Sequence, residues 1–282
     1  MRKDFPVSGS GLGLRREFTD KFELLKNSDV DFMEVAPENW MPYGGKFQEQ
    51  FARYAEQFPF VIHGLSLSIG GPTPLDTEFV KDVAKFMQQY DIKSYSEHLS
   101  YCSDDGHMYD LMPIPFTEEA VFYVADRIKQ VQDIIGQRLA MENVSYYAAP
   151  GQELSEIEFT NAVLQEADCD LLLDINNIYV NSINHRYDAK EFLLSLPKER
   201  IAYSHIAGHY DEAEDLKVDT HGSDVKADVW SLLEIAYDHF GVFPTLLERD
   251  FNIPPMQQLL SEVTHIKTLQ QKHLAKAVAA TA

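Results

Sequence analysis

The apolar residues of this chain fall into short blocks that alternate with segments of helical periodicity. Eight blocks rich in β-branched and aromatic residues, bounded by Gly, Pro, Asn or Asp, predict strands. They lie near residues 7–14, 31–36, 59–65, 93–98, 138–144, 170–175, 200–206 and 243–248. Between them, apolar residues recur at i, i+3, i+4 and i+7, as in TEFVKDVAKFMQQY from Thr77 and EEAVFYVADRIKQVQDII from Glu118, which predicts amphipathic helices.

This alternation of strand and helix predicts parallel strands with right-handed crossovers, in an open sheet or a closed barrel. Eight strands favour an α/β protein with a closed (β/α)8 TIM barrel. The glycines of Gly9-Ser10-Gly11-Leu12-Gly13 lie inside the first strand and open no helix, so we expect them to relieve crowding rather than to bind a nucleotide. We expect one domain over residues 1–274 and a frayed Ala-rich tail at 275–282.

Composition and charge exclude several classes of protein. Hydrophobic residues make up 45% of the 282 residues, but no apolar run reaches the length of a membrane span. The N-terminus has no apolar signal-peptide core, so we expect a cytoplasmic protein. Cys102 and Cys169 have no paired spacing, which argues against a disulfide framework or a thiolate zinc site. A net charge of -21 disfavours nucleic acid as a partner.

Residues able to bind metal ions stand at the end of one predicted strand after another. Because the carboxyl ends of the strands in a parallel barrel ring one mouth, we expect these side chains to converge. A single histidine at a strand end is more often a hydrogen-bonded core residue, but so many buried polar groups at one mouth would be costly without a cation. The eight candidate ligands are His63, His98, Glu142, Asp174, His205, Asp219, His221 and Glu248.

Imidazole and carboxylate groups together suit iron, zinc or manganese, and eight ligands can hold two or three ions. Two long connections, Ser100–Phe116 and Ala207–Ser223, follow strands at the same mouth and are candidate substrate loops. His107 and His209 lie in them and could contact substrate or support the ligands from behind. Less specific candidates are Glu34, Glu38 and Asn39, for which contact with substrate and a structural role in the loop are equally compatible with the sequence.

The ligand order His, His, Glu, Asp, His, Asp-x-His, Glu resembles that of the xylose-isomerase-like barrel superfamily, particularly the trinuclear endonuclease IV type. Seven motifs are more closely similar to the multinuclear non-haem iron-dependent oxidative enzymes, a family that includes the methanobactin-biosynthesis oxidase. The motifs are HGLSLSIGG, SEHLSY, MENVSYY, DINNIYVNS, HIAGH, DTHG and LLERD.

The resemblance implies that His63, His98 and Glu142 form a first metal site and that Glu142 bridges to a second. The second would include Asp174, His205 and Glu248, and the third Asp219 and His221. Endonuclease IV has a histidine three residues after the strand-six aspartate, whereas this chain has Asn177, a poorer ligand. This departure weakens the third site and argues against phosphodiester cleavage.

The family resemblance further implies oxidation by molecular oxygen of cysteine residues in a ribosomally synthesised precursor peptide, with a second protein that presents the peptide. Iron would be the cofactor, as two or three ions, with zinc or manganese as alternative occupants. A divalent-metal-dependent sugar isomerase or epimerase needs fewer ligands, and an endonuclease is disfavoured by the negative charge. A metal-binding scaffold protein is disfavoured by the long loops at the barrel mouth.

Overall fold

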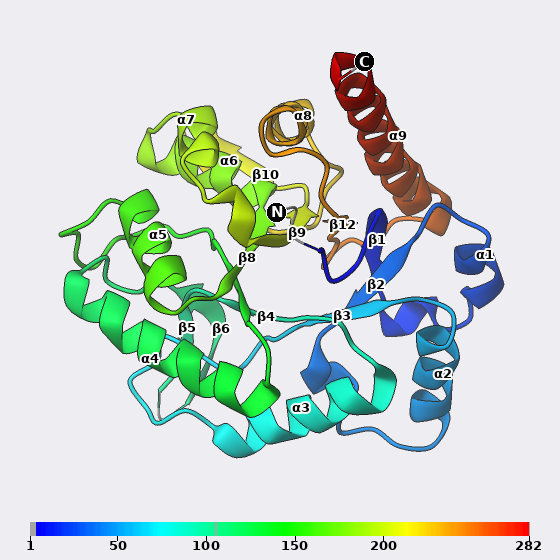
Figure 1. The fold of residues 1–282 in the computed structure, drawn as a ribbon, viewed down its shortest axis with the longest axis horizontal. Helices are drawn as coiled ribbons and strands as arrows, with labels where there is room; N and C mark the ends of the chain where they lie inside the picture. The colour runs from blue at the N-terminus through cyan, green and yellow to red at the C-terminus, as the bar shows by residue number, and fades with distance from the viewer. Residues whose placement is uncertain (1–3, 105, 282) are drawn as a thin grey trace.

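The computed structural model describes residues 4–104 and 106–281. Eight parallel strands close into a barrel in the order β1-β12-β9-β8-β7-β4-β3-β2, and the helices surround them (Figure 1). The strands are β1 Ser10–Gly13, β2 Phe32–Val35, β3 Phe60–His63, β4 Tyr95–His98, β7 Ala140–Glu142, β8 Asp170–Asp174, β9 Ile201–Ile206 and β12 Thr245–Leu247. Each lies within or close to a block that the sequence predicts, so the predicted (β/α)8 barrel is confirmed.

Nine α-helices lie among the described residues 4–104 and 106–281, and side-chain caps define where several of them begin. The helices are α1 Phe22–Lys26, α2 Lys46–Ala55, α3 Thr77–Tyr90, α4 Glu118–Ile135, α5 Glu156–Glu166, α6 Ile175–His185, α7 Ala189–Leu194, α8 Ala227–Phe240 and α9 Met256–Thr281. Asp76 accepts a hydrogen bond from the backbone N–H of Phe79 and Thr117 accepts one from that of Ala120, so both satisfy a free donor at a helix start. Short 3-10 turns occupy Arg16–Phe18, Pro37–Asn39 and Lys198–Arg200.

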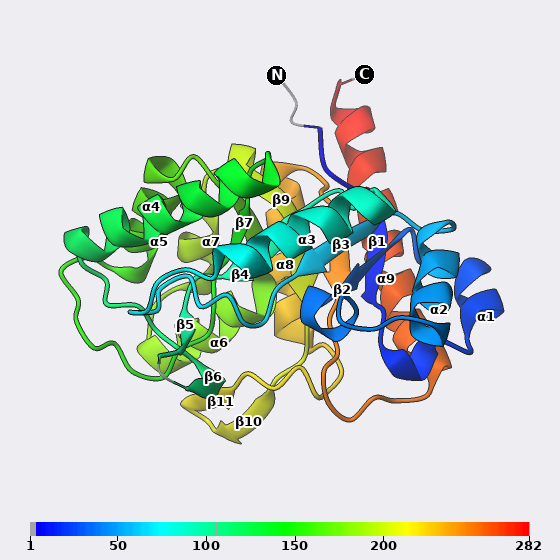
Figure 2. The same cartoon turned by 90° about the horizontal axis from the view of Figure 1, so that it is seen from below.

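The C-terminal segment differs from the frayed tail that its composition suggests. Helix α9 continues to Thr281, and its end projects beyond the barrel in both ribbon views (Figures 1 and 2). The physical reason is the run of alanines, which have the highest helix propensity of all residues and extend a helix already anchored by packing. Ala282 lies outside the described residues.

Both long connections that the sequence leaves as loops contain an antiparallel hairpin. The first pairs β5 Tyr101–Ser103 with β6 His107–Met112, and the second pairs β10 Tyr210–Ala213 with β11 Leu216–Val218. Figure 2 shows both hairpins at the same end of the barrel. They therefore stand at the mouth where the candidate ligands are expected, as ordered structures rather than irregular loops.

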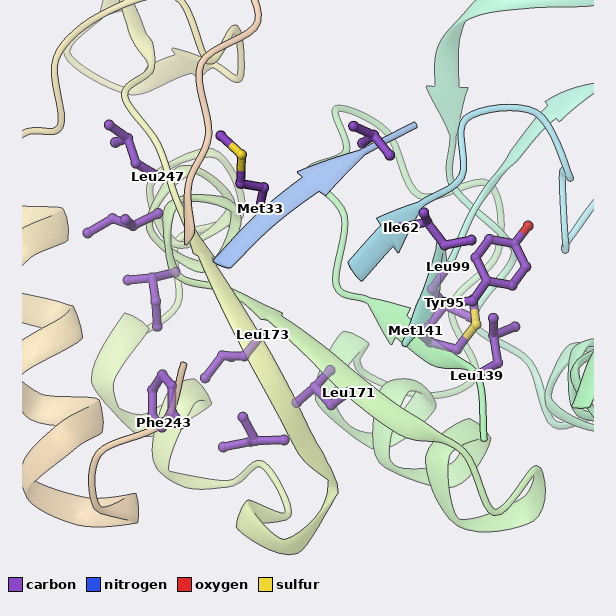
Figure 3. Packing of buried hydrophobic residues seen from close by; sticks show 14 of the residues in the cluster. Met33, Ile62, Tyr95, Leu99, Leu139, Met141, Leu171, Leu173, Phe243 and Leu247 are labelled. Carbon is purple, nitrogen blue, oxygen red and sulfur yellow. The ribbon is translucent and has the colours of Figure 1, made fainter. Parts of the chain in front are cut away.

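Alternation along the barrel strands sends residues to two different apolar layers. Outward residues such as Ile62, Met141 and Leu171 pack in the main core between the barrel and its helices (Figure 3). A smaller cluster of buried residues packs apart from this core and contains one residue each from β2, β3, β7, β8 and β12 and two from β9; its members are Val7, Phe32, Val61, Ala140, Leu172, Ala202, Tyr203 and Leu246. Gly11 leaves room for it, because a Cβ there would come within 2.5 Å of the Phe32 ring.

The inner layer explains why the candidate ligands share one space. On five strands a member of the inner cluster lies two residues before a candidate ligand, so both face the barrel interior. The pairs are Val61 and His63, Ala140 and Glu142, Leu172 and Asp174, Tyr203 and His205, and Leu246 and Glu248. The apolar cluster thus forms the floor of the site, and the ligands form the layer above it.

Cys102 and Cys169 are free and buried, in agreement with the absence of a paired cysteine spacing. Among the helices of the described residues, none is both long and apolar enough to cross a membrane.

Candidate metal centre

The eight candidate ligands come from the strand ends and from the segment after β11. Six stand at or next to the ends of β3, β4, β7, β8, β9 and β12, and Asp219 and His221 follow β11. Their side chains are buried or nearly so, with His221 12% and Asp219 14% exposed. Asn143 locks two of the strand ends together, because its side chain exchanges hydrogen bonds with the backbone N–H and carbonyl of Asp174.

His63, His98 and Glu142 form the first group. The Nε2 atoms of the two histidines are 3.0 Å apart. Glu142 Oε2 lies 3.0 Å from His63 Nε2 and 3.4 Å from His98 Nε2. Three potential ligand atoms therefore converge on one point, as tetrahedral metal sites with an open position require.

Two further groups of potential ligand atoms overlap with the first. Glu142, Asp174 and His205 form one group, and Asp174, His221 and Glu248 form the other, each with its ligand atoms within 4.8 Å of one another. Glu142 is shared by the first two groups, as the resemblance implies. Asp174 is shared by the last two, and Glu248 groups with His221, which differs from the expected assignment of these residues.

Asp219 belongs to none of the three groups, although its Oδ1 atom lies 2.7 Å from His221 Nε2. Its carboxylate accepts hydrogen bonds from Asn176 and Ser145, and its backbone N–H donates to the Tyr147 hydroxyl. These contacts hold Asp219 against the His221 ring. His221 itself has a φ of 48°, a left-handed conformation that is strained for a residue with a side chain.

Unpartnered buried atoms test whether these residues fit metal ions. Buried polar atoms in folded proteins almost always have a hydrogen-bond partner, because an unpartnered one costs about 1–3 kcal/mol. Five potential ligand atoms in this site are buried with no hydrogen-bond partner outside the set of candidate ligands: Glu142 Oε2, Asp174 Oδ2, His205 Nδ1, His221 Nε2 and Glu248 Oε2. They gather in one place and combine carboxylate oxygen with imidazole nitrogen. This donor set fits iron, zinc or manganese.

The acidic and imidazole side chains of the site shift one another's pKa values. Burial lowers the pKa of His63, but Glu142 and Glu34 outweigh it and raise this pKa to about 9. Burial and the charge of Glu142 raise the pKa of Asp174 well above its ordinary value. Burial opposes ionisation of Glu142 as well, but His98 and His63 outweigh it and hold its pKa down to about 2. Burial and the neighbouring His63 lower the pKa of His98 to about 4. A bound cation would relieve the repulsion between the carboxylates, since metal charge reverses the local preference for protonation.

The residues named as weaker candidates take different places. Asn177 donates from Nδ2 to Glu142 Oε1 at 3.1 Å, while its Oδ1 atom is buried without a hydrogen-bond partner. His209 lies outside the three groups, with Nδ1 2.8 Å from Asn176 Oδ1. Asn176 in turn donates to Asp219, which lies against His221. His209 therefore contacts the site through Asn176 and Asp219. His107 lies on β6 and lines the cavity above the ligands.

The sequence alone does not distinguish Glu34 from its neighbours, but the structure does. Glu34 is 6% exposed, and its Oε2 atom lies 3.0 Å from His205 Nε2. Glu38 instead accepts hydrogen bonds from the backbone N–H groups of Leu65 and Ser66. It therefore stabilises the loop after β3, which is the structural role that the sequence left open. The one sequence signal for Glu34 is a carboxylate inside an otherwise apolar strand.

A cavity of about 900 Å³ opens above the ligands. Its walls come from the hairpin β5–β6, the turn Arg15–Glu17 and the loops after β3, β7 and β12. Leu65, Tyr147 and Phe251 line it and are 43%, 53% and 65% exposed. This space is far larger than a single side chain requires and has apolar contacts at its rim.

A comparison with protein-family models identifies the family of this barrel protein. Residues 9–271 match the model of the RiPP precursor modification enzymes MbnB/TglH/ChrH. The chain belongs to this family. It is 64% identical over 260 residues to a UPF0276 protein of Shewanella sediminis, covering 92% of this chain and 94% of that one. It is 50% identical over 272 residues to the UPF0276 protein PA3283 of Pseudomonas aeruginosa, covering 96% and 95%.

Solved structures with similar folds have low sequence identity to this RiPP-modification family member. Endonuclease IV from Thermus thermophilus superposes with a TM-score of 0.59 at 14% identity, covering 95% of this chain and all of that one (100%). D-psicose 3-epimerase from Clostridium cellulolyticum gives a TM-score of 0.62 at 10% identity, covering 96% and 99%. At identities this low, the matches show only that the chain shares the barrel fold of these proteins.

Proposed function

We propose that this protein is an iron-dependent oxidase that uses molecular oxygen to modify cysteine residues of a ribosomally synthesised precursor peptide. The observation that carries the proposal is the set of three overlapping ligand groups, with five buried ligand atoms that have no partner outside the set, in a member of a peptide-modifying family. Isomerases and epimerases on this fold need no such number of ligands. We assign the eight named residues as ligands of two or three iron ions.

Iron held by these residues would supply a Lewis acid for a substrate thiolate and electrons for the reduction of oxygen. The protein residues bind and orient. Glu142 keeps two ligand groups at a fixed separation, and Asn177 holds the other oxygen of that carboxylate. The apolar cluster beneath the ligands excludes water from that side.

The cavity above the ligands supports a peptide as the substrate. A volume of about 900 Å³ accommodates several residues, and the exposed Leu65, Tyr147 and Phe251 offer contacts to side chains that flank the reacting cysteine. A second protein that presents the peptide belongs to the same proposal. The net charge of -21 argues against a nucleic-acid substrate.

The test combines metal analysis with a peptide assay. Protein purified without oxygen from iron-supplemented cells should hold at least two iron equivalents. With a cysteine-containing peptide encoded beside its gene, and the presenting protein where one is encoded, it should consume oxygen and change the peptide mass by loss of hydrogens or gain of oxygen. Zinc-loaded protein should do neither.

Two histidine variants test the metal site, one inside it and one outside it as the control. His98→Ala should lose metal, whereas His273→Ala should not, because His273 is a buried histidine that pairs with Asp238 outside the site. If zinc-loaded protein instead cleaves an abasic duplex or interconverts a ketose and an aldose, while iron-loaded protein ignores peptide and oxygen, the oxidase proposal fails.

A further inference from the structure

A continuous chain of buried hydrogen bonds runs beneath the metal centre and joins two of its histidines. His63 Nδ1 lies 2.9 Å from Ser96 Oγ, and Ser96 Oγ lies 2.7 Å from the Tyr203 hydroxyl oxygen. The Tyr203 hydroxyl donates to Glu34 Oε2 at 2.6 Å, and the same oxygen lies 3.0 Å from His205 Nε2. Every member is at most 6% exposed.

The direction of each hydrogen bond follows from counting donors. Glu34, as a carboxylate, can only accept, so it receives the Tyr203 hydroxyl proton and the His205 Nε2–H. The Ser96 hydroxyl has two acceptors within reach, the Ile62 carbonyl at 3.2 Å and the Tyr203 oxygen at 2.7 Å. We assign its proton to the shorter contact, so the Tyr203 oxygen accepts from Ser96 and Ser96 Oγ accepts from His63 Nδ1–H. All donors in the chain therefore point toward one carboxylate, that of Glu34 on β2, the strand that pairs with the His63 strand β3.

This direction fixes opposite tautomers for the two histidines. His63 carries its proton on Nδ1, which leaves Nε2 free to face His98 and Glu142. His205 carries its proton on Nε2, which leaves Nδ1 free beside Glu248 Oε2 at 2.9 Å.

We propose that Tyr203 is a positioning residue that couples the first and second metal positions, by linking His63 and His205 to the single carboxylate of Glu34. The inference rests on the metal centre of the proposed function but not on its substrate or on oxygen. Hydrogen bonds to the second nitrogen of a ligating histidine orient the ring and strengthen it as a ligand, and their loss costs about 10–100-fold in metal affinity. Here the Tyr203 hydroxyl would orient two ligands, His63 through Ser96 and His205 through Glu34.

The first measurement is nitrogen NMR of wild-type protein labelled with 15N-histidine and loaded with zinc. His63 should show metal-bound Nε2 and protonated Nδ1, and His205 should show metal-bound Nδ1 and protonated Nε2. Single replacements of each histidine assign the signals. Metal binding through Nε2 in both residues would overturn the proposal without any folded variant being needed.

The second measurement compares Tyr203→Phe with Tyr95→Phe. Tyr95 is an equally buried tyrosine whose hydroxyl donates to Glu97, apart from the chain that joins His63 to His205. Tyr203→Phe should shift the nitrogen signals of both His63 and His205 and weaken zinc binding about tenfold in a chelator competition. Ser96→Ala should affect the His63 signals and spare those of His205.

Tyr95→Phe should leave the histidine signals and the zinc affinity unchanged. If Tyr203→Phe leaves them unchanged as well, Tyr203 only fills space and the coupling is refuted. Failure of the oxidase proposal is distinguishable from this result, because the zinc-loaded measurements need no iron, peptide or oxygen.

Discussion

Replacing Glu97 by Gln isolates one buried carboxyl group whose protonation controls stability. Glu97 lies on β4 directly before His98, is 2% exposed, and accepts a hydrogen bond from the Tyr95 hydroxyl. It packs against Gly64 so closely that a Cβ there would come within 1.9 Å of Glu97 Oε1. Burial, together with the charge of Glu38, raises the pKa of Glu97 from 4.5 to about 8.

The sign of the effect follows from proton counting. Between pH 4.5 and about 8 the folded protein keeps the Glu97 proton, whereas the unfolded chain has released it. Stability from this group is therefore complete at low pH and is lost as the pH rises through about 8. One pKa unit corresponds to about 1.4 kcal/mol, so the whole shift is on the order of 5 kcal/mol.

Urea unfolding of metal-free wild type and Glu97→Gln at a series of pH values measures this contribution. Glutamine imitates the protonated carboxyl group and does not titrate. The stability of the variant relative to wild type should rise between pH 5 and pH 9 by several kcal/mol, with a slope of at most about 1.4 kcal/mol per pH unit. Glu119→Gln, at an exposed position on α4, is the control and should show no such rise. Parallel pH profiles for wild type and Glu97→Gln would refute the reasoning.

Two further predictions concern the ligands and the cavity. Glu142→Ala should lose more metal than His221→Ala by elemental analysis, because Glu142 belongs to two ligand groups and His221 to one; equal losses would contradict the bridging role. His107→Ala should keep the metal content of wild type, because His107 lines the cavity outside the ligand groups, and should weaken peptide binding in a titration; metal loss would place His107 among the ligands.

The sequence predicts the barrel and the convergence of the ligands for a simple physical reason. A closed parallel barrel places all strand ends at one mouth, whatever the details of packing. The alternation of each strand then decides which residues face inward, so Val61 predicts the direction of His63, and Leu172 that of Asp174. Strand order and the alternation of residues along each strand can both be read from a single sequence.

Glu34 could not be found in this way, because its partner is not a neighbour in the sheet. Strand β2 pairs with β1 and β3, whereas His205 lies on β9, three strands further round the barrel from β2. Their contact crosses the barrel interior and depends on its closure. The sequence also does not show which of the adjacent amides, Asn176 or Asn177, contacts Glu142. That depends on how the chain passes from β8 directly into α6.

The hairpin β5–β6 is hard to predict from the sequence for a different reason. The sequence Ser103-Asp104-Asp105-Gly106 contains an Asp-Gly pair, which is a frequent signal for a tight hairpin turn. The segments on either side are short and polar enough to resemble loops. Asp105 lies outside the described residues, but the pairing of Ser103 with His107 establishes the hairpin.

The free-energy cost of burying the acidic residues of the candidate metal centre connects the fold to the proposed chemistry. Four carboxyl groups, from Glu34, Glu142, Asp174 and Glu248, lie in one layer and are at most 9% exposed. Removing charges from water costs several kcal/mol for each ion, and the histidines paired with Glu34, Glu142 and Glu248 offset part of this cost. Metal ions that bind only the folded state offset this cost and stabilise the barrel by mass action. The proposed metal binding would therefore account for so acidic an interior better than packing alone does.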